Sequence, residues 1–232
     1  MSANTTATPV TWQLELLGGL RATRGRRVLT RFPTRKTGHV LAMLSLHPER
    51  PRTRDAVIDA FWPDSAPAAG RNSLSRALSA LRRLLEPADA PGSVLVSDRH
   101  HVGLATGAVE TDVARLRAAW DAAGRLDPGG GPYLDLLLGA VELYRGELLP
   151  GADGDWVEAE RASLARLHVR ILEHIVERHM GDGNARAAVG VARRAVAAEP
   201  LRERLGEDTL ARCLDQGRAW KWPSVVRRLR RS

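Results

Sequence analysis

The pattern of apolar and polar positions is clearest from Arg71 to Leu85, where it has the period of an amphipathic α-helix. At 100° per residue the apolar positions share one arc, with Ala77 and Leu84 beside it: Leu74, Leu78, Leu81 and Leu85. The opposite face has no carboxylate and consists of Asn72, Ser75, Arg76, Ser79, Arg82 and Arg83. Such a face suits an anionic partner, although a basic helix that is merely solvated stays the alternative at this point.

The pattern before this helix changes from the period of a strand to that of a helix. Trp12, Leu14 and Leu16 alternate with polar residues, and glycines divide residues 12–29 into two or three predicted antiparallel strands. From Pro33, which we expect in the first turn, a helix is predicted as far as His47.

The segments on both sides of the basic helix also have predictable structures. Thr53 is the expected N-cap of another helix that ends at Trp62, and a loop from Trp62 to Pro67 leads into the basic helix. Glu86-Pro87 closes the basic helix, because a residue before proline is disfavoured in the α region. Val94 and Val96, then Val102 and Leu104, predict a hairpin with a basic tip. A short sheet, three helices and a hairpin is the order of a winged helix-turn-helix, which favours DNA as the anion.

The second half is predicted to be almost wholly helical. Glu110-Thr111-Asp112 begins a helix, the glycine cluster at 127–131 is a loop, and further helices are expected at 132–149, 155–180 and 184–198. Asp155 and Glu158 suggest a capping box. The small residues Ala188, Ala192 and Ala195, followed by Pro200, match one tetratricopeptide helix.

The sequence offers little support for catalysis or for a bound cofactor. His168, His174 and His179 are not spaced as ligands on one helical face, and Asp153 and Asp155 lack the remaining positions of a calcium loop. Cys213 is the single cysteine, and no nucleophile, zinc or phosphate-loop motif is present. We therefore expect no enzyme, no metal and no cofactor.

Composition indicates a globular protein with an uneven charge. The 232 residues are 44% hydrophobic and 27% charged, with a net charge of +8. Residues 1–105 hold 15 basic and 8 acidic side chains, whereas residues 106–232 hold 20 and 19. We expect a phosphate-binding surface mainly in the first half. No apolar run has the length of a membrane span and the opening is polar, so we expect a cytoplasmic protein.

Two groups of motifs resemble the Streptomyces antibiotic regulatory protein family. GRNSLSRALSALRRLLEP and SVLVSDRHHVGL are similar to that family's winged helix, and LYRGELLPGADGDWVEAER and ARAAVGVARRAVAAEPLRE to its bacterial transcriptional activator domain. The resemblance covers about residues 12–204. It implies a mainly α fold with small β elements: an OmpR-type winged helix, then an all-α tetratricopeptide-like domain. It also implies activation of biosynthetic gene clusters, through direct repeats near promoters and contact with RNA polymerase.

The resemblance and the residue pattern together assign the candidate sites. Residues near the start of a recognition helix usually reach bases, so the base-reading candidates are Asn72, Ser75, Arg76 and Ser79. The candidates for phosphate are Arg35, Lys36, Arg54, Arg71, Arg82, Arg83, Arg99, His100 and His101. By resemblance, the loop that contains Trp62, Pro63 and Asp64 would face the polymerase.

The expected organisation is a leader at 1–11, the winged helix at 12–106, the helical domain at 110–217 and a basic tail at 218–232. The expected partners are double-stranded DNA and RNA polymerase holoenzyme, with a homodimer on direct repeats and no membrane. After residue 204 the chain departs from the family pattern. The alternative function is a protein-interaction module whose winged helix no longer binds DNA.

Overall fold

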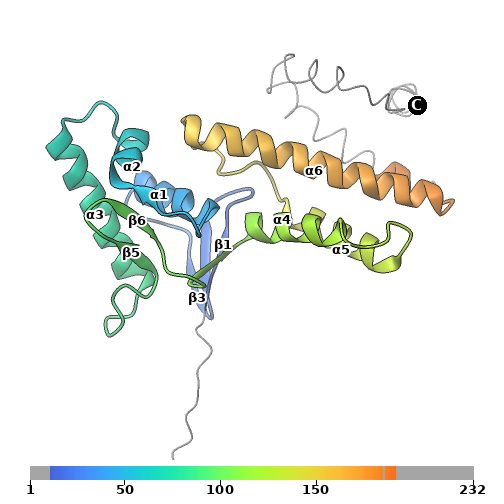
Figure 1. The fold of residues 1–232 in the computed structure, drawn as a ribbon, viewed down its shortest axis with the longest axis horizontal. Helices are drawn as coiled ribbons and strands as arrows, with labels where there is room; N and C mark the ends of the chain where they lie inside the picture. Colours follow the sequence, from blue (N-terminus) through green and yellow to red (C-terminus); the bar gives the residue numbers. More distant parts are fainter. Residues whose placement is uncertain (1–10, 185, 192–232) are drawn as a thin grey trace, which may run out of the picture.

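The structure, a computed structural model, describes residues 11–184 and 186–191 of the chain (Figure 1). The leader up to residue 10, Cys213, Ala192, Ala195, Pro200 and the basic tail lie outside the described residues. The elements are β1 (Trp12–Glu15), β2 (Arg21–Arg24), β3 (Arg27–Leu29), α1 (Arg35–Leu46), β4 (Arg52–Thr53), α2 (Arg54–Phe61), α3 (Pro67–Leu85), β5 (Leu95–Ser97), β6 (His101–Leu104), β7 (Val109–Thr111), α4 (Asp112–Ala123), α5 (Gly131–Leu143) and α6 (Asp155–Gly181).

The N-terminal sheet has the strand order β3-β2-β1-β7. Its first three strands are antiparallel, as the alternation predicted, and Trp12 and Leu14 lie on its buried face. The fourth strand, β7, is a difference from the prediction: it follows the expected end of the winged helix at residue 106, yet it pairs in parallel with β1. Residues from both sides of the expected boundary therefore complete one sheet.

Helices α1, α2 and α3 and the second sheet, of order β4-β6-β5, form the winged helix. Thr53 caps α2 as predicted, with its hydroxyl accepting the N–H of Ala56. Thr34 caps α1, so Pro33 lies before the helix and its expected place in the first turn was wrong. Helix α3 begins at Pro67, four residues before the expected start, because proline at the first helical position needs no N–H partner.

The helical half consists of α4, α5 and α6, with α6 lying along the other two (Figure 1). Helix α4 begins where the sequence predicted a helix start, and Thr111 caps it by accepting the N–H of Ala114. Helix α5 ends at Leu143 and not at Leu149, because the segment after it pairs with the residues that follow β1: Leu148 forms a bridge with Leu17. The capping box expected at Asp155 is absent, since the N-cap of α6 is Gly154 and no side chain caps this end.

One continuous hydrophobic core runs through both halves. Buried side chains of the sheet, such as Leu16, belong to the same cluster as Leu137 and Ile171 of the helical half. Asp112, the first residue of α4, also links the two halves, because its carboxylate accepts the backbone N–H groups of Leu16 and Leu17 at 2.9–3.0 Å. Among the helices that the structure describes, none is long and apolar enough to cross a membrane.

Candidate nucleic-acid interface

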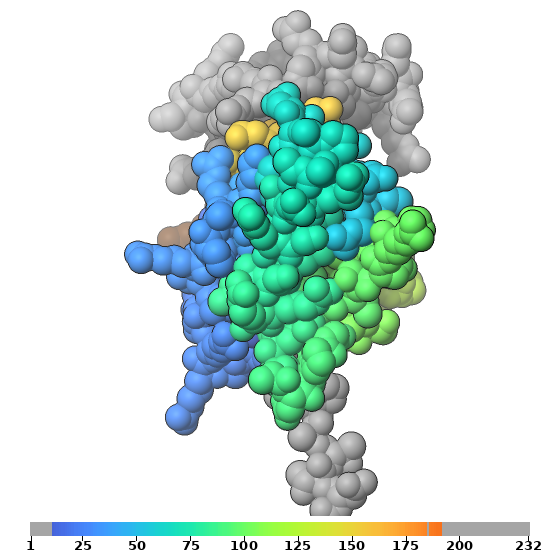
Figure 2. Space-filling view, turned by 90° about the vertical axis from the view of Figure 1, so that its left-hand side faces the viewer, coloured from blue at the N-terminus to red at the C-terminus, as the bar shows by residue number. Residues whose placement is uncertain are grey.

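Helix α3 buries its leucine stripe and exposes its polar face along the middle of one side of the molecule (Figure 2). Leu74, Leu78 and Leu81 are at most 1% exposed. The four base-reading candidates all lie on the exposed face: Asn72, Ser75, Arg76 and Ser79. The structure thus brings these side chains together on one helix surface, with hydrogen-bond donors and acceptors of the types that read base edges.

The wing is the hairpin of β5 and β6, and its tip carries three exposed basic side chains: Arg99, His100 and His101. Asp98 shapes this tip, because its Oδ1 accepts the backbone N–H groups of His101 and His100 at 2.7 and 2.6 Å. These hydrogen bonds hold the pKa of Asp98 below its usual value. Val96 was expected to share a face with Val94 but is exposed, while Leu95 is buried in its place.

Two of the phosphate candidates hold α3 to its neighbours. Arg82, in the last turn of α3, donates from Nη2 to Ser97 Oγ on the wing at 2.6 Å. Arg54, at the start of α2, donates to Ser75 Oγ at 3.3 Å. The remaining phosphate candidates of α3, Arg71 and Arg83, are exposed. Arg82 and Arg54 therefore link α3 to the wing and to α2, contacts that helical periodicity does not reveal.

The structure does not bring Arg35 and Lys36 to this surface. Arg35 donates to the Gly151 carbonyl at 3.0 Å and lies 3.6 Å from an Asp153 carboxylate oxygen. Lys36 donates to the carbonyl of Phe61 at 2.5 Å and lies over the ring of Trp62. Both cations thus have partners within the protein, at the N-terminal end of α1.

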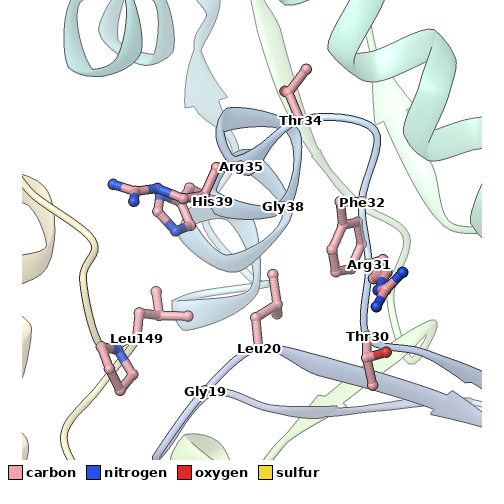
Figure 3. A pocket seen from close by; sticks show the side chains of 11 residues that line it. Gly19, Leu20, Thr30, Arg31, Phe32, Thr34, Arg35, Gly38, His39 and Leu149 are labelled. Carbon is pink, nitrogen blue, oxygen red and sulfur yellow. The ribbon is translucent and has the colours of Figure 1, made fainter.

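A cavity of about 440 Å³ lies beside that end of α1 (Figure 3). Arg35, His39 and Leu149 line one side of it, and Phe32 lines the other. Burial, and then the charge of Arg35, lower the pKa of His39, and the charge of Asp153 only partly opposes them. The cavity lies between α1 and the segment before α6, and no residue of α3 lines it.

A buried carboxylate that the sequence reasoning missed anchors the far end of α3. Glu86, expected only to close the helix, is 9% exposed and accepts the backbone N–H groups of Gly92, Val94 and Leu95 at 2.7–3.2 Å. The sequence gives no separate signal for this role, because a residue before Pro87 is already expected at the end of a helix. The contact links the end of α3 to the start of the wing.

The described residues contain no group of three or more His, Cys, Asp or Glu side chains that could hold a metal ion.

The loop with Trp62, Pro63 and Asp64 connects α2 to α3. Pro63 and Asp64 are exposed, and Trp62 is half-buried against Phe61. The loop is therefore accessible to solvent at Pro63 and Asp64.

Comparisons with known proteins agree with this architecture. Residues 111–221 match the model of the bacterial transcriptional activator domain. The chain is 33% identical over 198 residues to the regulatory protein AfsR of Streptomyces coelicolor, covering 83% of this chain and 19% of AfsR. It is 25% identical over 217 residues to AfsR of Streptomyces griseus, covering 91% of this chain and 21% of that relative. The chain thus spans about a fifth of the length of these regulatory proteins.

A solved structure of Mycobacterium tuberculosis EmbR, in complex with a low-affinity phosphopeptide, has a similar fold. The TM-score is 0.68 at 25% identity, over 84% of this chain and 56% of the EmbR chain. The predicted fold class, a winged helix followed by a helical domain, is thereby confirmed. The match to the bacterial transcriptional activator domain and the similarity to AfsR support the resemblance of this chain to the Streptomyces antibiotic regulatory protein family.

Proposed function

We propose that this protein is a sequence-specific DNA-binding transcriptional activator. The observation that supports it most is the exposed polar face of α3, on which Asn72, Ser75, Arg76 and Ser79 lie together beside a basic wing tip. Arginine can pair with guanine and asparagine with adenine, each through two hydrogen bonds. In this proposal the wing tip, with Arg99 and two histidines, holds the phosphate backbone next to the groove.

The test compares Arg76→Ala with Arg99→Ala on duplexes selected from a random pool and on scrambled duplexes. Arg76→Ala should cost about 1–3 kcal/mol on the selected duplex and relax the preference at one base pair. Arg99→Ala should weaken all duplexes alike and lower the slope of log K against log salt by about 0.9. If Arg76→Ala loses the same factor on both duplexes, Arg76 binds phosphate and does not read bases.

Activation would require a contact with RNA polymerase holoenzyme, for which the loop of Trp62, Pro63 and Asp64 is the proposed surface. In this proposal two copies bind direct repeats near the promoter of a biosynthetic gene cluster, and the protein acts at the bacterial nucleoid. Asp64→Lys should reduce transcription in vitro while leaving DNA affinity unchanged, because Asp64 lies outside the polar face of α3. Equal losses of both would count against a polymerase contact.

A second candidate is a protein-interaction module whose winged helix does not bind DNA. The similar EmbR chain was solved with a phosphopeptide, which supports a peptide-binding role somewhere in such proteins. The exposed arginines of α3 favour the DNA-binding proposal over this one. Absence of any salt-dependent affinity for duplex DNA would favour the module.

A further inference from the structure

The positive charge of the first half is concentrated outside the recognition helix and the wing. Residues 16–48 contain seven Arg and Lys side chains and no Asp or Glu. Residues 49–105, which include α3 and the wing, contain eight basic and seven acidic side chains and are nearly neutral. The excess charge that favours an anionic partner therefore belongs to the N-terminal sheet and α1.

Three of these cations gather at the tip of the β2–β3 hairpin: Arg24, Arg26 and Arg27, here named the hairpin arginines. Arg24 and Arg27 are directly opposite each other in the antiparallel register. Both guanidinium groups lie over the ring of Trp12, at 6.0 and 5.7 Å from its centre. Like charges in directly opposite positions destabilise a sheet, so this arrangement suits a surface that binds an anion.

No carboxylate among the described residues forms an ion pair with the hairpin arginines. The nearest candidate on the neighbouring strand is Glu15, which is in register with Arg21. Its Oε2 pairs instead with Arg145 Nη1 of the helical half, at 3.1 Å. The one acidic side chain of the first strand is thus engaged elsewhere, and the cluster keeps its charge.

The hairpin tip lies against the C-terminal end of α3. Arg24 Nη1 donates to the carbonyl of Leu85 at 3.4 Å, and Trp12 Nε1 donates to the same oxygen at 3.0 Å. The exposed Arg83 is in the last turn of the helix, close to this contact. In Figure 2 the N-terminal segment, in blue, flanks α3 on one side, and the green segment that includes the wing flanks it on the other.

In a complex with DNA, the length of α3 would bring this end close to a DNA strand. From Ser75 to Leu85 the helix advances about 15 Å at 1.5 Å per residue. The major groove is about 12 Å wide, so a helix whose first half reads bases has its last turn over the bordering phosphates. We propose that the hairpin arginines bind these phosphates, giving the protein a second backbone contact on the flank of α3 away from the wing. This inference rests on the proposed DNA-binding function.

The test uses the full chain with Arg26→Gln and Arg27→Gln combined. Arg24 is retained because it also holds the end of α3. The matched control combines Arg115→Gln and Arg166→Gln, which remove the same charge from exposed positions of α4 and α6. The hairpin variant should bind selected and scrambled duplexes roughly tenfold more weakly than the control, with a salt slope lower by up to about 1.8. Its ratio of selected to scrambled affinity should be unchanged.

Ethylation of single phosphates supplies a direct readout. Modified phosphates just outside the α3 footprint should interfere with binding of the wild type and the control but not of the hairpin variant. Equal affinity and slope for the hairpin variant and the control would overturn the inference alone. A wild type whose binding shows no salt dependence would overturn the proposed function itself, so the two failures are distinguishable.

Discussion

Two buried carboxylates, Asp112 and Glu86, act on the backbone and not on other side chains. Asp112 accepts N–H groups from the two residues after β1 and from its own helix, and Glu86 accepts three from the segment that leads into the wing. Burial raises the pKa of Asp112, while the N–H groups of Leu17, Leu16 and Val113 oppose that effect. Sequence reasoning placed both residues at helix ends but did not identify the distant backbone groups that they bind, because these lie on other elements.

Replacement of Asp112 by Ala should lower the free energy of unfolding by about 1–3 kcal/mol, because the N–H groups of Leu16 and Leu17 lose their acceptor inside the core. Urea denaturation measures the change. Asp121→Ala, at an exposed position of the same helix, is the control and should change stability by less than about 0.5 kcal/mol. Equal effects of the two substitutions would mean that the carboxylate of Asp112 contributes nothing specific.

At the site, the residue pattern predicted which side chains of α3 face outward, and the structure places all four base-reading candidates there. Four of the phosphate candidates instead form contacts within the protein. Arg82 and Arg54 donate to serine hydroxyls on neighbouring elements. Arg35 and Lys36, at the N-terminal end of α1, donate to backbone carbonyl groups. Charge alone cannot separate these roles, since each depends on which element lies beside the side chain.

Among elements, the strands of residues 12–29, the caps Thr53 and Thr111 and the hairpin were predictable, because their signals are local. The wrong end of α5 and the missed strand β7 both result from contacts between segments far apart in the sequence. Helix α5 stops at Leu143 because the chain beyond it pairs with the segment that follows β1: Gly18 N–H donates to Glu147 O, and Leu149 N–H donates to Leu16 O. Strand β7 exists for a similar reason, since β1 offers it a free edge.

Gly18 permits the first of these pairings. Its φ of +89° disfavours any side chain, and an added Cβ would meet the Arg145 backbone at 3.3 Å. Gly18→Ala should therefore destabilise the protein by about 1–3 kcal/mol, from left-handed backbone strain and from the close approach. Gly107→Ala, at φ +73° with open space around it, is the control that carries backbone strain alone. Thermal unfolding that ranks Gly107→Ala as the more damaging change would contradict this reasoning.

The wing and the recognition helix should act as one element through Arg82 and Ser97. Ser97→Ala removes the acceptor of a 2.6 Å charge-assisted hydrogen bond. We expect DNA affinity to fall by about 0.5–1.5 kcal/mol on all duplexes, because the wing tip is then held less firmly beside the groove. Ser93→Ala, exposed in the loop before the wing, is the control. A change in base preference with Ser97→Ala would show that the wing also affects reading.

At the scale of the whole molecule, Glu160 of α6 joins the two halves. Its carboxylate meets His47 Nε2, just after α1, at 2.7 Å and Arg117 Nη2 of α4 at 2.5 Å. Burial alone would raise the pKa of Glu160, but the His47 hydrogen bond and the Arg117 charge outweigh it and hold the pKa below its ordinary value. The ionised carboxylate is thus more stable in the folded protein than in the unfolded chain.

Glu160→Gln should remove a pH-dependent part of the stability. A carboxyl group with a lowered folded pKa stabilises the fold above its unfolded pKa and loses this effect as the pH falls through the folded value. The wild type should therefore be more stable than the variant near pH 7, by about 1 kcal/mol, and the difference should vanish in acid. Asp135→Asn, exposed on α5, is the control. A difference that persists unchanged below pH 3 would rule out the ionised carboxylate as its source.

The parallel pairing of β1 with β7 has a consequence for synthesis on the ribosome. The contact between Leu16 and Asp112 spans 96 residues, so β1 leaves the ribosome well before its partner exists. At 5–20 residues per second the wait is roughly 5–20 s, far longer than a hairpin needs to form. During that interval β1 and β2 can pair, but one edge of β1 stays open to other strands. The emergence of residues 109–149 closes that edge and completes the N-terminal sheet.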